Sequence, residues 1–179
     1  YTGGITRFLQ TGSGYVPYTG QSRTRGLDFF LKKDLKNLSF WFAYTWSKTE
    51  EAFPYFADDD YKPAMHDQRH ELKVAALAKM RAFHFSADYV VGTGFPDPEQ
   101  LPQEAVYQNP YSRLDVSALV QLLNRKLHLD AGISVLNVLN TENINYANYT
   151  RIREEESSLV SFYAEGVPVT PALFVKIYF

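Results

Sequence analysis

The sequence predicts an all-β protein, a transmembrane antiparallel β-barrel. Three observations predict this fold class. Seven segments alternate between large apolar residues and small or polar ones, which is the period of a strand with one apolar face. The segments run about 10–14 residues, longer than a soluble strand and long enough to cross a bilayer. The connections alternate between short turns and long loops, as in outer-membrane barrels.

Composition narrows the class further. Thirteen Tyr, thirteen Phe and two Trp bring the aromatic share to 16%, and these residues favour strands and membrane–water interfaces. No stretch approaches the roughly 18 apolar residues of a membrane helix. The absence of Cys excludes disulfides, zinc–thiolate sites and cysteine nucleophiles. A net charge of -2 does not indicate nucleic-acid binding.

The first two expected strands cover residues 22–34 and 38–50. In the first strand, Leu27, Phe29 and Leu31 alternate with Asp28, Phe30 and Lys32. In the second, the apolar face carries Leu38, Phe40, Phe42, Tyr44 and Trp46, and the opposite face carries Ser39, Trp41, Ala43, Thr45 and Ser47. Side chains two residues apart share a face, so each strand has one apolar side and one mixed side.

Four further strands are expected over residues 67–80, 82–95, 111–123 and 126–140. Their apolar positions are Leu72, Val74, Ala76 and Ala78; Phe83, Phe85, Ala87, Tyr89 and Val91; Leu114, Val116, Ala118, Val120 and Leu122; and Leu129, Ala131, Ile133 and Val135. The intervening positions are mainly polar or charged. A soluble antiparallel sandwich would alternate too, but its inner face would carry most of the Phe and Leu, and its outer face would be strongly charged rather than small and mixed.

The last expected strand covers residues 170–179. Leu173, Val175, Ile177 and Phe179 alternate up to a C-terminal aromatic residue, the form of the signal that the outer-membrane assembly machinery reads. Short turns are expected at 35–37, 80–82 and 124–126, and long outer loops at 51–66, 96–110 and 141–168. Strands 22–34, 67–80, 111–123 and 170–179 then run towards the periplasm.

Residues 1–21 are expected to form an outer loop with a partial strand. Tyr1 to Leu9 offers a short eighth strand, although Gly3 and Gly4 weaken it and residues 10–21 read as loop. Two architectures follow: a closed eight-stranded barrel, or the C-terminal strands of a larger barrel, in which residues 22–179 form about the last seven. Single-chain bacterial barrels have an even strand number, so seven strands do not close one. We favour the larger barrel, because the eighth strand is weak.

Several short strings, in order along the chain, resemble TonB-dependent outer-membrane receptors of the Bacteroidetes type. They are TRGLDFFLKK and LSFWFAYTWSK (24–33 and 38–48), DQRH (67–70), GTGFP (92–96), YSRLD (111–115) and VLNVLN (135–140). The resemblance implies a 22-stranded barrel with a plugged lumen, of which this chain is about the last third. It implies import of a scarce large ligand into the periplasm, such as a siderophore, cobalamin, glycan or peptide.

The same resemblance implies the partners. They are the lipid bilayer of the outer membrane, the receptor's own N-terminal plug and remaining strands, and the TonB energy-coupling system reached through that N-terminal region. A surface lipoprotein is a further candidate. The alternatives are a small eight-stranded structural or adhesive barrel without transport and an outer-membrane hydrolase.

No enzymatic site is expected. The chain has no G-x-S-x-G string, and Ser86, His84 and Asp88 share one strand face without forming a relay. His66 and His70 fall in a strand entry, where i and i+4 lie some 13 Å apart, so we expect Asp67 and Arg69 to pair with neighbours instead of a metal site. Asp58–Asp60 and Glu154–Glu156 read as solvated acidic loops. No cofactor and no metal are expected.

Two sets of residues are the candidate functional surfaces. Strand parity points one set of charged residues to the lumen: Asp28, Lys32, Arg69, Glu71, Lys73, Asp88, Arg113, Asp115, Asp130 and Lys176. Aromatic residues and arginines of the long loops suit stacking and hydrogen bonding to a ligand: Tyr55, Phe56, Tyr61, Tyr107, Tyr146, Tyr149, Arg151 and Arg153.

Overall fold

The computed structural model describes residues 1–11, 14–54, 60–97, 107–124, 127–151 and 159–178. Over these ranges the chain is all-β, and every pair of neighbouring strands is antiparallel. None of the described residues belongs to a helix that could cross a membrane. The expected all-β, antiparallel class is therefore confirmed.

Eleven strands make up the described chain. They are β1 (Thr2–Thr11), β2 (Gly14–Asp34), β3 (Leu38–Ala52), β4 (Lys62–Pro63), β5 (His70–Met80), β6 (Phe83–Gly92), β7 (Tyr111–Asn124), β8 (Leu127–Leu136), β9 (Ile144–Arg151), β10 (Leu159–Glu165) and β11 (Thr170–Tyr178). Nine of them form one sheet, in the order β1-β2-β3-β5-β6-β7-β8-β11 with β4 against β3; β9 and β10 pair only with each other. Each of the seven expected segments holds one strand of the large sheet.

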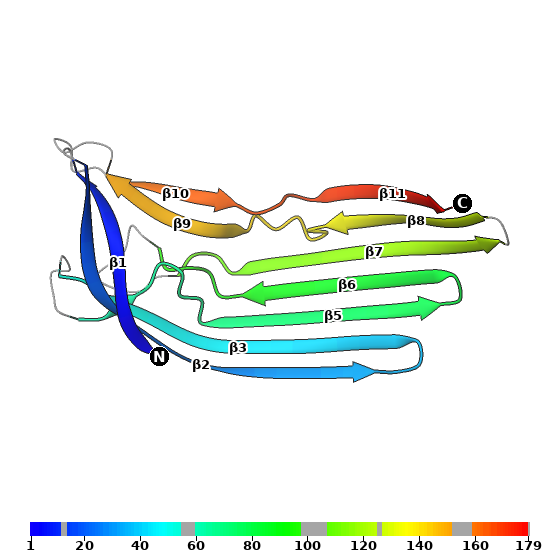
Figure 1. Cartoon of the computed structure of the whole chain (residues 1–179), viewed down its shortest axis with the longest axis horizontal. Coiled ribbons are helices and arrows are strands. Elements are labelled where there is room, and N and C mark those ends of the chain that lie inside the picture. Colours follow the sequence, from blue (N-terminus) through cyan, green and yellow to red (C-terminus); the bar gives the residue numbers. More distant parts are fainter. Residues whose placement is uncertain (12–13, 55–59, 98–106, 125–126, 152–158, 179) are drawn as a thin grey trace.

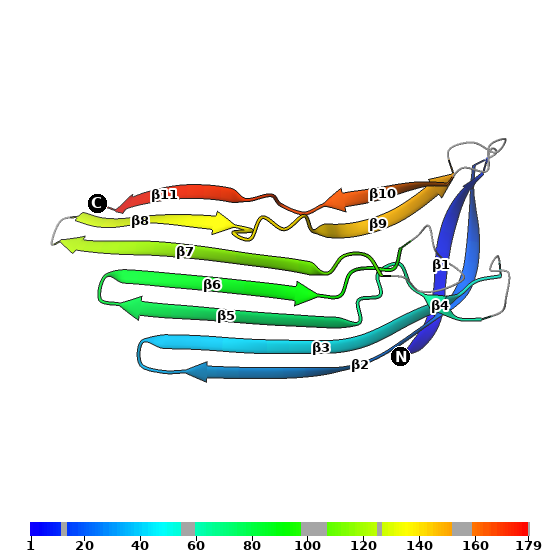
Figure 2. The same cartoon turned by 180° about the vertical axis from the view of Figure 1, so that it is seen from behind.

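The long strands lie side by side as one layer (Figures 1 and 2). Tight connections join β2 to β3 and β5 to β6 at one end, which we call the turn end (Figure 1). β7 and β11 end there, and β8 begins there. The β1–β2 hairpin and the β9–β10 hairpin lie at the opposite end, the loop end. The turn between β5 and β6 reverses the chain through Arg81, whose φ is 56°.

The N-terminal segment contains more strand than the loop with a partial strand that the sequence predicts. Residues Thr2–Thr11 form β1, and β2 begins at Gly14, eight residues before the expected start at residue 22. The ladder from Thr2↔Arg23 to Thr11↔Gly14 satisfies the backbone groups of both segments. Tertiary pairing thus outweighs the weak strand propensity of Gly3 and Gly4.

The structure differs from the expected boundaries at three other places. β8 ends at Leu136 and not at residue 140, because Asn137 and Asn140 adopt φ values of 51° and 50° that a strand cannot contain. The stretch 141–168, expected as a loop, contains the β9–β10 hairpin. The stretch 51–66 contributes β4.

The sheet has little conventional core. Among the described residues, the buried apolar side chains are Phe53, Ala64, Ala75 and Pro96. Phe53 packs at the loop end against Gly20 of β2, where an added Cβ would meet the Ala52 carbonyl oxygen and lie 2.5 Å from the Phe53 ring. The buried part of the structure thus gathers at the loop end, while most of the sheet is a single layer.

Candidate functional site

The strand register separates the sheet into two faces. Leu27 stands opposite Trp46, Phe42 opposite Val74, and Tyr89 opposite Leu114. We call this side the apolar face; it carries Leu27, Phe29, Leu31, Phe40, Phe42, Leu72, Val74, Phe83, Phe85, Leu114, Val116, Leu129, Ile133, Leu173, Val175 and Ile177. Large side chains on it stand open to the surroundings, with Leu27 73% and Leu173 80% exposed.

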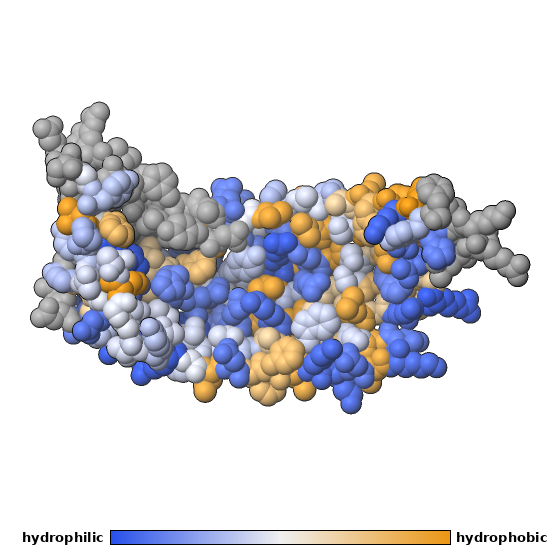
Figure 3. All heavy atoms as spheres, in the orientation of Figure 1, coloured by the Kyte–Doolittle hydropathy of each residue, from blue (hydrophilic) through white to orange (hydrophobic). Residues whose placement is uncertain are grey.

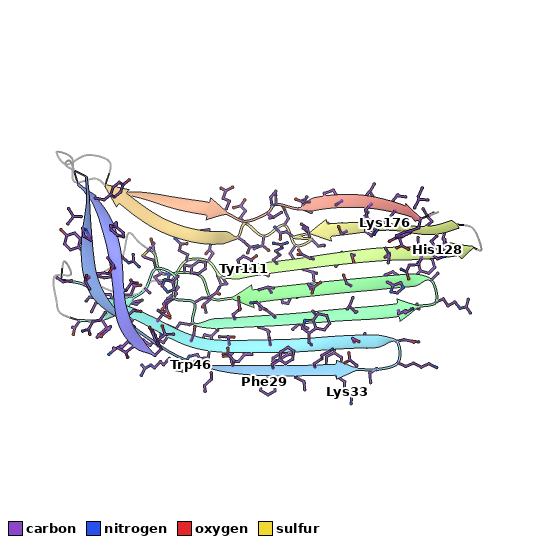
Figure 4. All side chains as sticks on the ribbon, in the orientation of Figure 1. Phe29, Lys33, Trp46, Tyr111, His128 and Lys176 are labelled. Atoms are coloured by element: carbon purple, nitrogen blue, oxygen red, sulfur yellow. The ribbon has the colours of Figure 1, made fainter. Side chains whose placement is uncertain are left out.

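The apolar face holds a band without charge. Arg25 and Lys48 stand opposite each other at the loop end, and Lys33 lies near the turn end. Between these levels, none of the side chains that the structure describes on this face is ionised at neutral pH. Figure 4 places Phe29 between Trp46 at the loop end and Lys33 at the turn end. A continuous exposed patch of this kind marks an interaction surface, for a partner protein, a ligand or a membrane.

Polar-tipped aromatic residues border the band at the loop end. Trp46 stands opposite His70, and the Tyr44 hydroxyl lies 2.7 Å from His70 Nδ1 with the two rings stacked. The Tyr89 hydroxyl lies 3.2 Å from Ser112 Oγ. Aromatic rings with a polar end suit the level where an apolar layer meets water.

The opposite side, the charged face, unites the lumen candidates. The register aligns Asp28 with Thr45, Thr45 with Glu71, Asp88 with Asp115, and Asp130 with Lys176. By the same alternation this face carries Asp28, Lys32, Glu71, Lys73, Asp88, Arg113, Asp115, Asp130 and Lys176, while Arg69 lies one residue before β5. In Figure 3, hydrophilic and hydrophobic side chains are interspersed over the strands, and hydrophilic ones gather at the turn end.

Several of these charges pair along their own strand. Arg113 donates two hydrogen bonds to Asp115, at 2.8 and 2.7 Å. Lys73 lies 2.7 Å from Glu71, and Lys32 lies 3.3 Å from Asp34. Because residues i and i+2 share a face, these pairs keep both charges on the charged face.

A buried carboxylate joins three loop-end segments. Asp67 accepts hydrogen bonds from the Thr49 backbone N–H (2.6 Å), Arg69 Nε (2.7 Å) and the Tyr107 hydroxyl (2.6 Å). Its side chain is 0% exposed. Burial, and then the hydrogen bond to Asp67, raise the pKa of Tyr107 to about 12. We call this group the Asp67 clamp. The sequence predicts that Asp67 and Arg69 pair with neighbours, and in the structure they pair with each other.

Two buried asparagines hold the base of the β9–β10 hairpin. Asn143 exchanges two hydrogen bonds with the Ser112 backbone, at 2.7 and 2.8 Å. Asn137 Nδ2 donates to the Thr141 and Val167 carbonyls, at 3.0 and 2.9 Å. The two residues are 4% and 1% exposed. Sequence reasoning missed this role, although repeated Asn after an apolar strand is a recognisable sign of a turn.

The outer-loop candidates that the structure describes lie in three different places. Tyr107 belongs to the Asp67 clamp. Tyr61 donates to Gln21 Oε1 at 2.8 Å, and Arg23 lies over its ring at 4.0 Å. Tyr146, Tyr149 and Arg151 lie on β9, whereas Tyr55, Phe56 and Arg153 fall outside the described residues.

Of the C-terminal assembly signal, three residues are described. Leu173, Val175 and Ile177 of β11 share the apolar face, opposite Ile133, Ala131 and Leu129 of β8. Phe179 lies outside the described residues. Phe174, on the charged face, fills the space above Gly132, where an added Cβ would lie 2.5 Å from its ring.

Comparison of the chain with known protein families, with curated proteins and with solved structures found no match.

Proposed function

We propose that this chain forms part of the wall of a bacterial outer-membrane β-barrel, in a transporter of the TonB-dependent type. The observation that carries the proposal is the charge-free band on the apolar face of seven long strands. A soluble protein seldom leaves so many large apolar side chains open on one continuous face. Lipid hydrocarbon covers such a band without a free-energy penalty for exposing apolar side chains to water. The charged face then lines the water-filled interior of the barrel.

The sheet itself supports a barrel larger than this set of strands. β2 and β11 border the long-strand layer, and alternate pairing makes them run in the same direction. An all-antiparallel barrel closes only through an odd number of further strands between them. β1 does not supply one across the band, since it pairs with residues 14–23 of β2. The small eight-stranded barrel is therefore the weaker alternative.

In this function the barrel wall is the pathway for a scarce large ligand. The ligand class stays that of the family the sequence resembles: a siderophore, cobalamin, glycan or peptide. The partners are the plug and remaining strands, the TonB system, the assembly machinery and a candidate surface lipoprotein. The chain's own contribution is a rigid wall with a charged inner surface and clamped outer loops, and no chemical step is assigned to it.

Single-cysteine spin labelling tests the proposal, because the chain has no native Cys. Labels at Leu173 and Val175 should be accessible to oxygen and shielded from a water-soluble nickel chelate. Labels at the alternate positions Ala172 and Lys176 should respond to the chelate. Equal access of the chelate to all four positions, or recovery of the native protein in the soluble fraction, would refute membrane embedding.

A further inference from the structure

A basic patch lies on the apolar face immediately beyond the charge-free band. Going towards the loop end, the pair Leu27↔Trp46 is followed by Arg25↔Lys48 and then by Arg23↔Glu50. Successive pairs on one face of two strands are two residues apart, about 7 Å along the strand. The three basic side chains and Glu50 thus occupy the first two levels after the aromatic border.

Glu50 organises this patch. Its carboxylate lies 2.6 Å from Lys48 Nζ and 2.9 Å from Arg23 Nε, and its side chain is 8% exposed. Burial alone would raise the pKa of Glu50, but the hydrogen bonds from Lys48 and Arg23 outweigh it and hold the pKa below the ordinary value. Glu50 therefore stays ionised at neutral pH, so three positive charges face one negative charge.

Arg23 is fixed in an orientation that leaves it accessible. Tyr61 packs 4.0 Å beneath its guanidinium and holds Gln21 through its hydroxyl. The Arg23 side chain still keeps 49% of its surface exposed. A guanidinium held flat by an aromatic ring and one carboxylate is preorganised to bind an oxyanion.

Arg25 is the unbalanced member of the patch. It is exposed and stands directly opposite Lys48, another cation. Within the described ranges, no side chain forms an ion pair or hydrogen bond with it. Like charges directly opposite each other destabilise a strand pair unless an anion lies between them.

We propose that Arg23, Arg25 and Lys48 bind the phosphate of an anionic lipid in the leaflet at the loop end. This inference rests on the proposed membrane-spanning function. The position of the patch favours a lipid over other anions. The patch begins one residue pair beyond Trp46 on the same face, which is the level of the lipid headgroups if hydrocarbon covers the charge-free band. A phosphate accepts bidentate hydrogen bonds from Arg and a point-charge contact from Lys.

The test uses the full-length protein in nanodiscs of phosphatidylcholine with or without phosphatidic acid. Native mass spectrometry measures retained phosphatidic acid and its apparent Kd. Each basic residue near the surface contributes about a five-fold factor, so R25Q should weaken retention about 5-fold and R25Q/K48Q about 30-fold. R25Q is the variant that tests binding without a folding defect, since Arg25 contacts no described acidic group.

The matched control is K32Q/K79Q, which removes the same charge from the charged face. Both residues sit at the turn end, and Lys32 contributes only an exposed pair with Asp34. The control should retain phosphatidic acid like the parent protein. Inorganic phosphate, added to the nanodiscs that contain phosphatidic acid at an equal phosphate concentration, should not displace the lipid.

Equal retention by R25Q, R25Q/K48Q and the parent protein would overturn the lipid site while leaving the membrane-spanning function intact. Equal losses in the control and in R25Q/K48Q would also overturn it, as a general charge effect. Failure of the parent protein to enter nanodiscs at all would instead refute the proposed function.

Discussion

Replacing Asp67 by Ala should release the loop end of the sheet. The substitution removes the common acceptor of the Thr49 backbone N–H, Arg69 Nε and the Tyr107 hydroxyl. A hydrogen bond to a buried charge contributes about 1.5–3 kcal/mol, and an abandoned buried donor costs about 1–3 kcal/mol. The Arg69 side chain is 25% exposed and regains water, so the three losses do not add.

We therefore expect the local opening free energy to fall by about 3 kcal/mol. Hydrogen exchange reports that change directly, because a fall of this size accelerates exchange about 100-fold. The Thr49 amide and the Arg69 amide, which donates to Thr93 Oγ1, should exchange faster. Exchange in the strand centres, for example at Val116, should stay unchanged. Asp60→Asn, an exposed acidic position, is the matched control.

Tyr107 provides a second measure of the same clamp. Its folded pKa of about 12 exceeds the ordinary value of about 10. A raised pKa in the folded state gives stability that is complete below about pH 10 and is lost as pH rises through about 12. The titration of Tyr107 is isolated by subtracting the phenolate absorbance of Asp67→Ala/Tyr107→Phe from that of Asp67→Ala. In this difference, Tyr107 should titrate at a lower pH than in the parent protein. Unchanged exchange together with an unchanged Tyr107 titration would refute the clamp.

Three further predictions test the two faces and the loop end. Val175→Lys puts a charge into the charge-free band and should cost about 2–4 kcal/mol in outer-membrane assembly. Ala172→Lys, on the charged face of the same strand, should assemble normally. Equal assembly of both variants would contradict the assignment of faces. Gly20→Ala forces a Cβ against the Ala52 carbonyl and the Phe53 ring, and hydrogen exchange should show the β1–β2 hairpin destabilised by about 1–3 kcal/mol. Gly4→Ala is the control, because an added Cβ there meets no atom within 4 Å. Similar destabilisation by both substitutions would show that the close approach at Gly20 is unimportant. Asn143→Ala leaves the Ser112 backbone groups unpaired and should accelerate amide exchange about 10-fold at Ser112 and at Gly166, which donates to the Asn143 carbonyl. Asn109→Ala, at an exposed position, should not change exchange at these sites. Slow exchange at both sites in Asn143→Ala would show that other contacts hold the hairpin base.

Alternation made the faces of the long strands predictable. Side chains two residues apart on a strand point to the same side, so Leu173, Val175 and Ile177 had to share a face once β11 was recognised. The same rule grouped Asp28, Glu71, Asp88 and Asp115, although they come from four strands. Antiparallel pairing then aligned these local faces, since a slip of one residue would invert a whole strand.

Local pattern was insufficient where contacts between distant segments decide the conformation. The β1–β2 hairpin forms over glycines and a loop-like stretch because each strand satisfies the other's backbone groups. The early end of β8 depends on Asn137, whose amide finds its acceptors at Thr141 and Val167. Neither partner can be inferred from the alternation of the strand that precedes them.

The sequence by itself determined the all-β class, the seven long strands and the separation of apolar from charged residues, because all three depend on a period of two along the chain. Only the tertiary structure decided which charges meet. Asp67 with Tyr107 and Arg23 with Glu50 are 40 and 27 residues apart, and register and loop path bring them together. The Asp67 clamp and the basic patch therefore emerge from pairing between strands, which no single strand's pattern encodes.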